Sequence, residues 1–251
     1  LLAVCDTRAA EWPYQLARGA DYYMQPAWHP TGEWLAWVEW DAPDMPWDAT
    51  RLVLARLAGS PPRVVDKRVI AGLTGRGVFT QPVFSPDGNW LAYIAEEGDW
   101  DVLMLMELSS GKTDTLRVDE PVLFSPLAWV QGVRTLGWSP SSHRLYAISN
   151  RFGEAAIWQI DIQSGKCVRM DNGGYTWFKQ LAVSPITEEL ALISSSPNKA
   201  ECVIRWDGSR WREAALNDAW LLPENSLASP QAVSWQSEDG AEVFATYYPP
   251  Y

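Results

Sequence analysis

A ten-residue phrase that recurs along the chain constrains the fold more than any other feature of the sequence. Its clearest copy, residues 84–93, reads Phe-Ser-Pro-Asp-Gly-Asn-Trp-Leu-Ala-Tyr. Pro86 sets a turn φ, Asp87 bonds neighbouring backbone, and Gly88 takes the left-handed conformation that closes the turn. The residues from Trp90 onward alternate with period two, which predicts a β-strand covered on both faces.

Related phrases at residues 28–37, 138–140 and 183–185 lead into apolar segments of the same kind. Their prolines, at positions 30, 86, 140 and 185, recur roughly every 45 to 56 residues. A repeat of about 40–50 residues that holds several short strands is typical of a β-propeller. We therefore predict an all-β chain, a β-propeller of four-stranded antiparallel blades with four full blades and a partial blade at each end.

Each repeat divides into four predicted strands joined by turns. The ranges are 25–28, 34–38, 51–55 and 63–66; 83–84, 90–95, 102–108 and 113–117; 135–138, 145–149, 156–162 and 167–170; and 181–183, 190–194, 201–206 and 211–214. Strand pairs at residues 1–6 with 12–17, and 232–236 with 242–247, form the partial blades. In this antiparallel order the loops after each second strand share one rim, so we expect variable binding loops at 39–50, 96–101, 150–155 and 195–200.

Composition narrows the class of protein and of partner. The chain has 251 residues and a formal net charge of −11, which argues against nucleic acid or an anionic membrane as a partner. Cys5, Cys167 and Cys202 are sparse and lack Cys-x-x-Cys spacing, which favours reduced thiols and a cytoplasmic location. No apolar run approaches the roughly 18 residues of a membrane span. The chain begins at Leu1 without a methionine, which we interpret as an excised fragment, so the presence of a signal peptide stays open.

The sequence offers little for catalysis. Its two histidines, His29 and His143, lie in turns, where we predict structural roles, and no Gly-x-Ser-x-Gly elbow is present. The glycine-rich residues 72–77 have the wrong order for a dinucleotide loop and lack the Lys-Ser/Thr of a phosphate loop, so they are interpreted as a linker between blades. We predict no catalytic residue and no cofactor.

Two acidic groups remain as candidate sites. Three aspartates at 41, 44 and 48 alternate with prolines at 43 and 46, which favours a shaped loop over a metal site. Glu96 and Glu97, followed by Asp99 and Asp101, would pair with the free amine of a substrate. A solvated hairpin loop is the alternative interpretation of this second group.

Longer phrases resemble one enzyme family. Residues 38–52 read Val-Glu-Trp-Asp-Ala-Pro-Asp-Met-Pro-Trp-Asp-Ala-Thr-Arg-Leu, which closely resembles the Trp-Asp-x-Pro-x-Met-Pro-Trp-Asp loop of bacterial dipeptidyl aminopeptidase/acylaminoacyl-peptidase-like enzymes of the prolyl oligopeptidase (S9) family. Residues 23–30 match the same group. Residues 149–153 resemble its Ser-Asp-Arg-x-Gly loop, with Asn150 in place of the aspartate. Residues 233–250 resemble the segment where such enzymes enter their α/β-hydrolase domain.

The resemblance implies a role and two partners. Residues 1–236 would be the propeller, incomplete at its N-terminus, and 237–251 an exit segment toward an absent α/β-hydrolase domain that carries the catalytic Ser, Asp and His of the family. The propeller would then be non-catalytic and would gate the access of short peptides to that domain of the same polypeptide. Glu96 and Glu97 would hold a substrate N-terminus, and the remaining candidates on the variable face are Trp40, Asp41, Met45, Trp47, Asp48 and Arg151.

Two other interpretations stay open. The first is a free-standing TolB-like propeller that serves as a protein-interaction module, which shares the Ser-Pro-Asp-Gly repeats. The second is a self-sufficient propeller hydrolase with paired carboxylates, disfavoured because no acidic pair recurs at a fixed position in the blades.

Overall fold

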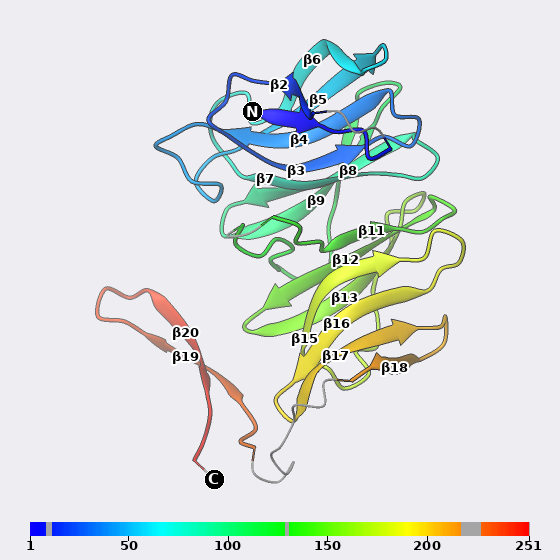
Figure 1. The fold of residues 1–251 in the computed structure, drawn as a ribbon. Helices are drawn as coiled ribbons and strands as arrows, with labels where there is room; N and C mark the ends of the chain where they lie inside the picture. The colour runs from blue at the N-terminus through cyan, green and yellow to red at the C-terminus, as the bar shows by residue number, and fades with distance from the viewer. Residues whose placement is uncertain (9–11, 129–130, 217–226, 251) are drawn as a thin grey trace. The chain divides into compact units, whose positions relative to one another are not determined.

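The computed structural model of the chain describes residues 1–8, 12–128, 131–216 and 227–250. These residues form an all-β fold of four four-stranded and two two-stranded antiparallel sheets (Figure 1). Within the described ranges, no helix is long and apolar enough to cross a membrane.

The strands follow one another in chain order through every sheet. They are β1 (Leu2–Val4), β2 (Tyr14–Ala17), β3 (Tyr22–Trp28), β4 (Trp34–Trp40), β5 (Arg51–Ala58), β6 (Arg63–Ala71), β7 (Phe79–Phe84), β8 (Trp90–Glu97), β9 (Trp100–Glu107), β10 (Thr113–Leu116), β11 (Leu136–Trp138), β12 (Arg144–Arg151), β13 (Glu154–Asp161), β14 (Cys167–Arg169), β15 (Trp177–Val183), β16 (Leu190–Ser196), β17 (Lys199–Trp206), β18 (Trp211–Ala215), β19 (Gln231–Gln236) and β20 (Glu242–Tyr247).

The sheets confirm the predicted blade architecture. The four-stranded sheets are β3–β6, β7–β10, β11–β14 and β15–β18, and each pairs its strands in sequence order. Two-stranded sheets, β1–β2 and β19–β20, stand at the two ends of the chain. The protein therefore has a β-propeller fold with four full blades and a partial blade at each end.

The chain divides into two compact units, each described by itself. The first holds residues 1–117 and 125–133, and the second holds residues 118–124 and 134–251. In the first unit, buried apolar side chains of sheet β3–β6 such as Val38 and Leu54 pack with Leu91 and Met106 of sheet β7–β10. The opposite face of β3–β6 packs, through Trp37, on the β1–β2 pair.

The second unit repeats this arrangement. Tyr146, Ile148 and Ile157 of sheet β11–β14 are buried with Phe178 and Leu192 of sheet β15–β18. Within each unit, the alternating strands predicted from the sequence thus bury a row of side chains against the neighbouring sheet.

The turn histidine joins two repeats. The Nε2 of His29 donates a hydrogen bond to the carbonyl oxygen of Gly88 at 2.9 Å, and its Nδ1 lies 2.8 Å from the Oγ1 of Thr31. The ring of Phe84 meets the imidazole edge-on at a centroid distance of 5.2 Å. The predicted structural role of His29 is confirmed, and the bond to Gly88 extends it to the next blade. His143 is exposed in its turn.

Three of the four predicted variable loops are tight hairpin turns. Strands β8 and β9 continue their pairing to Glu97 and Trp100, leaving only residues 98–99 as the turn. Residues 152–153 and 197–198 close the hairpins β12–β13 and β16–β17 in the same way. Glycines with left-handed φ, Gly98 at 66° and Gly153 at 82°, allow two of these two-residue turns. Of these four loops, only the connection between β4 and β5, residues 41–50, is long.

Candidate functional site

The candidate site of the first unit is the loop at residues 41–50, termed the 41–50 loop. Inside the loop, the Asp44 amide donates to the carbonyl oxygen of Asp41 at 3.1 Å, and the Asp48 amide donates to the carbonyl oxygen of Met45 at 2.9 Å. The Asp48 carboxylate accepts the Met45 amide at 2.9 Å in return. These local bonds are those of turns started by Asp, and they engage the Asp48 carboxylate in shaping the loop.

The start of the loop is tied to the sheet by Asp41. Its carboxylate accepts a hydrogen bond from Nη2 of Arg51 at 2.7 Å and one from the amide of Asp21 at 3.0 Å. The Arg51 hydrogen bond, followed by the one from the Asp21 backbone, lowers the pKa of Asp41 below its usual value. Next to it the indole of Trp40 stacks on Tyr22, with ring centroids 5.2 Å apart. Both predicted residues therefore fix the base of the loop.

A buried carboxylate lies directly beneath this base. Glu39 accepts a hydrogen bond from Nε1 of Trp37 at 2.7 Å, and Nζ of Lys67 lies 3.3 Å from its other oxygen. Nε of Arg51 approaches the same carboxylate at 3.7 Å, so Arg51 bridges Glu39 to Asp41. Sequence reasoning assigned no role to Glu39. Its signal was a single acidic residue within an otherwise apolar strand.

The end of the loop is tied to the next blade. The Thr50 amide donates to the carbonyl oxygen of Gly77 at 3.1 Å, and its hydroxyl accepts the Phe79 amide at 2.7 Å while donating to the Phe79 carbonyl at 2.9 Å. At Gly72, which has a φ of 84°, an added Cβ would lie 2.2 Å from the carbonyl oxygen of Thr50. The glycine-rich segment predicted as a linker does join two blades, and it also forms one wall of the loop's frame.

Between these anchors the loop presents its remaining side chains. Met45 is exposed and Trp47 is half-buried. Among the described residues, no group of three or more His, Cys, Asp or Glu side chains could hold a metal ion. The 41–50 loop is thus a rigid surface with an exposed thioether, suited to contact rather than to acid–base chemistry.

The two predicted substrate glutamates lie elsewhere in the first unit, near the end of strand β8. Glu97 forms an ion pair with Arg117, whose Nη2 donates to Oε1 at 2.7 Å, and this bond lowers the pKa of Glu97. Glu96 is exposed and lies opposite Asp101 in the register of the sheet. Because neighbouring residues of a strand point to opposite faces, the two carboxylates do not converge on one point. Their role in binding a substrate N-terminus stays a prediction.

The candidate residue of the second unit is Arg151, the last residue of β12. Its guanidinium donates to the carboxylate of Glu120 at 2.8 Å and lies 4.8 Å from the centroid of the Phe152 ring. These two contacts hold the guanidinium at the hairpin turn of β12–β13.

The chain is similar in sequence and in fold to peptidases of known structure or function. No family model matches the chain. Over 106 residues it is 26% identical to dipeptidyl-peptidase 5 of Porphyromonas gingivalis, a match that covers 40% of this chain and 14% of that protein. A solved puromycin hydrolase superposes with a TM-score of 0.84 and 24% identity over 95% of this chain and 35% of its own. A puromycin-hydrolyzing peptidase of Mycobacterium tuberculosis superposes with a TM-score of 0.83 and 24% identity, over 95% of this chain and 36% of its own.

TolB of Acinetobacter baumannii superposes with a lower TM-score, 0.62, at 18% identity over 98% of this chain and 56% of its own. The chain spans about a third of the length of the solved peptidases it matches. Its fold is that of an S9-type peptidase propeller, which agrees with the resemblance carried by residues 38–52.

Proposed function

We propose that this chain is the non-catalytic propeller of an S9-type serine peptidase, and that it gates the access of short peptides to an α/β-hydrolase domain of the same polypeptide. The observation that carries the proposal is the superposition on the puromycin hydrolase, with a TM-score of 0.84 over 95% of the chain. The match to a dipeptidyl peptidase and the Met-Pro-Trp loop support the same choice.

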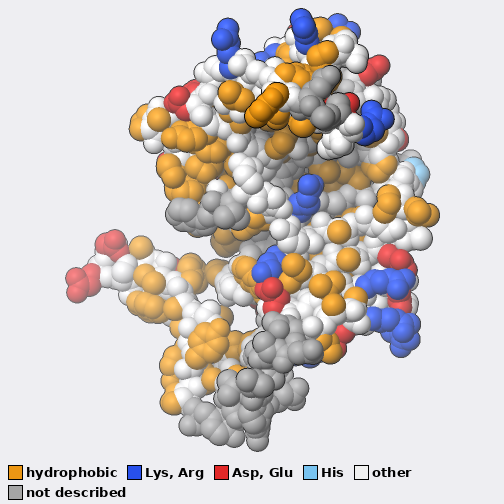
Figure 2. Space-filling view, viewed as in Figure 1, with side chains coloured by type: hydrophobic (Ala, Val, Ile, Leu, Met, Phe, Trp, Pro, Cys, Tyr) orange, Lys and Arg blue, Asp and Glu red, His pale blue; other side chains and the backbone are white. Residues whose placement is uncertain are grey.

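The hairpin β19–β20 supports a domain junction at the end of the chain. Its strands pair over six positions, so the predicted boundary between residues 236 and 237 would divide this hairpin, and we propose that the hairpin as a whole forms the junction. Val233, Trp235 and Tyr247 lie on the same face of the hairpin, and their side chains are 37%, 52% and 48% exposed. Figure 2 shows hydrophobic side chains gathered along this hairpin. We propose that the hydrolase domain covers this apolar face.

The proposed gating would act by size exclusion. Packed blades leave little room for a folded protein to reach a nucleophile behind them, whereas a short extended peptide can pass. The rigid 41–50 loop would contribute contact surface along that route through Met45. No charge or base on the propeller is needed for this role.

A TolB-like interaction module is the second candidate, since TolB also superposes over 98% of the chain. In that case the 41–50 loop would bind a protein partner. The two proposals differ in whether a serine nucleophile resides in the same polypeptide.

Labelling of the native full-length protein tests this difference. A serine-reactive fluorophosphonate probe is added to the source cells' extract, and an antibody against this chain detects the product. A labelled band at least about twice the 28.2 kDa mass of this chain is expected, with heat-denatured extract as the control. An unlabelled band near that mass would overturn the peptidase proposal.

Size exclusion needs a separate measurement on the purified enzyme. Cleavage of chromogenic dipeptides, a 30-residue unfolded peptide and a folded protein is compared under the same conditions. A steep fall in rate with size is expected, and equal rates would contradict gating. The cytoplasmic location also remains a prediction, to be tested by cell fractionation with the same antibody.

A further inference from the structure

Phe152 has an unfavourable backbone conformation for a bulky residue. It occupies the two-residue turn between β12 and β13 with a φ of 52°, next to Gly153 at 82°. Glycine or asparagine usually fills such a position, because the left-handed region brings a side chain into conflict with its own backbone. An aromatic ring at this turn therefore needs a compensating contact.

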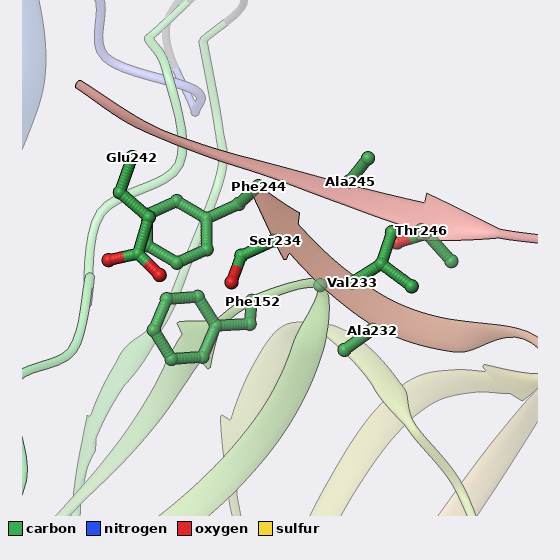
Figure 3. A pocket seen from close by; sticks show the side chains of 9 residues that line it. Phe152, Ala232, Val233, Ser234, Glu242, Phe244, Ala245 and Thr246 are labelled. Carbon is green, nitrogen blue, oxygen red and sulfur yellow. The ribbon is translucent and has the colours of Figure 1, made fainter. Parts of the chain in front are cut away.

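The compensating contact comes from the hairpin β19–β20. The rings of Phe152 and Phe244 are stacked, with centroids 4.7 Å apart and planes 29° apart (Figure 3). The guanidinium of Arg151 also lies over the Phe152 ring, 4.8 Å from its centroid. It donates a hydrogen bond to the carboxylate of Glu120 at 2.8 Å. An ion-paired cation thus lies against the same ring that stacks on the hairpin.

The face of the hairpin that meets the turn differs from its apolar face. Ala232, Ser234, Phe244 and Thr246 share this face by their cross-strand register, and with Phe152 they line a groove of about 440 Å³. The approach is close at Gly153, where an added Cβ would lie 3.3 Å from the Thr246 Oγ1. Phe152 and Phe244 both line this groove, and their stacked rings form an apolar contact across it.

A hairpin of two strands has little stability of its own in water. Packing against a larger sheet can stabilise such a hairpin. The Phe152–Phe244 pair is a packing contact of this kind. We propose that Phe152 is a positioning residue that docks the hairpin β19–β20 onto the β12–β13 turn, and so sets the direction in which the chain leaves the propeller. This inference does not depend on the proposed function.

Hydrogen exchange of the purified chain tests the docking. In Phe152→Asn the turn keeps a residue that tolerates left-handed φ, so the propeller should fold with an unchanged or higher unfolding midpoint. The amides of residues 231–247 should exchange about 2- to 10-fold faster, the factor that corresponds to losing one aromatic pair. Phe244→Ala should produce the same acceleration. Ile186→Asn, which removes an exposed apolar side chain from a turn of the same unit, is the matched control and should leave exchange at 231–247 unchanged.

The double variant Phe152→Asn/Phe244→Ala separates docking from independent local effects. If the two rings act on each other, its exchange should equal that of either single variant. Unchanged exchange in Phe152→Asn, or accelerations that multiply in the double variant, would overturn the proposal. Should Phe244→Ala weaken the hairpin by itself, the Phe152→Asn result alone still decides, because that residue lies outside the hairpin.

Discussion

Replacement of Glu39 by glutamine tests whether the buried carboxylate beneath the 41–50 loop stabilises the propeller. The side chain of Glu39 is only 5% exposed, and its two cationic neighbours, Lys67 and Arg51, are 34% and 29% exposed. Glutamine has nearly the same shape and can still accept the hydrogen bond of Trp37 Nε1. The substitution therefore removes the charge and leaves the packing.

The expected loss follows from the geometry. Removing one partner of a fully buried ion pair costs about 3–5 kcal/mol, because the other charge stays buried. Here the cations reach water with about a third of their surface and can be rehydrated, so we expect about 2 kcal/mol. With a urea m-value of about 3 kcal/mol/M, the unfolding midpoint should fall by about 0.7 M.

The assay is equilibrium urea unfolding followed by tryptophan fluorescence and circular dichroism. Asp114→Asn is the matched control, because Lys112 and Asp114 form an ion pair at 2.9 Å that is largely exposed in the same unit. We expect little shift of the midpoint for this control. A Glu39→Gln shift of the midpoint below about 0.2 M, or one equal to the control, would refute the reasoning that burial makes this carboxylate important for stability.

The frame of the loop yields two further predictions. Gly72→Ala should destabilise the protein by at least about 1 kcal/mol more than Gly75→Ala in thermal unfolding, because both glycines have left-handed φ but only the first would bring a Cβ to 2.2 Å from Thr50; equal losses would contradict this. Asp41→Asn should cost about 0.5 kcal/mol at pH 7, since the hydrogen bond from Arg51 lowers the folded-state pKa of Asp41. The cost should be complete above the unfolded-state pKa of about 3.9 and vanish as pH falls through the folded-state value, so a difference between Asn variant and parent that persists at lower pH would count against it.

The blade architecture could be predicted from the sequence because its signals are local. A proline turn and the period-two strand that follows it lie within about ten residues of each other, and a related pair recurs in every repeat. The sequence predicts the bounds of a polar outer strand less well. Strand β6 runs to Ala71, whereas the sequence predicts only residues 63–66. The cause is that Asp66, Lys67 and Arg68 interrupt the apolar pattern.

The site could be predicted only in part, for a different reason. The sequence predicts a shaped loop over residues 41–48, because prolines and aspartates are typical of turns. The partners of Glu39 are Arg51 and Lys67, which lie on other strands. A pattern of neighbouring residues in the sequence cannot predict a contact between strands of this kind. The sequence predicts a strand over 90–95 and places Glu96 and Glu97 in the loop after it, yet both residues continue the ladder of β8. Phe152 carried no signal at all, since its φ is set by the hairpin around it.

The 41–50 loop and the hairpin β19–β20 are held in different ways, and the difference bears on how a propeller of this kind would select peptides. The 41–50 loop is fixed at its start through Asp41 and Arg51 and at its end through Thr50, which bonds the neighbouring blade. A loop bonded at both ends cannot swing as a lid without breaking the charge-assisted hydrogen bond from Arg51 to Asp41 together with the hydrogen bonds of Thr50 to Gly77 and Phe79. Selection at this loop would therefore follow from its shape, while any movement on binding would be sought at the hairpin β19–β20, a two-stranded element that an aromatic pair joins to the β12–β13 turn.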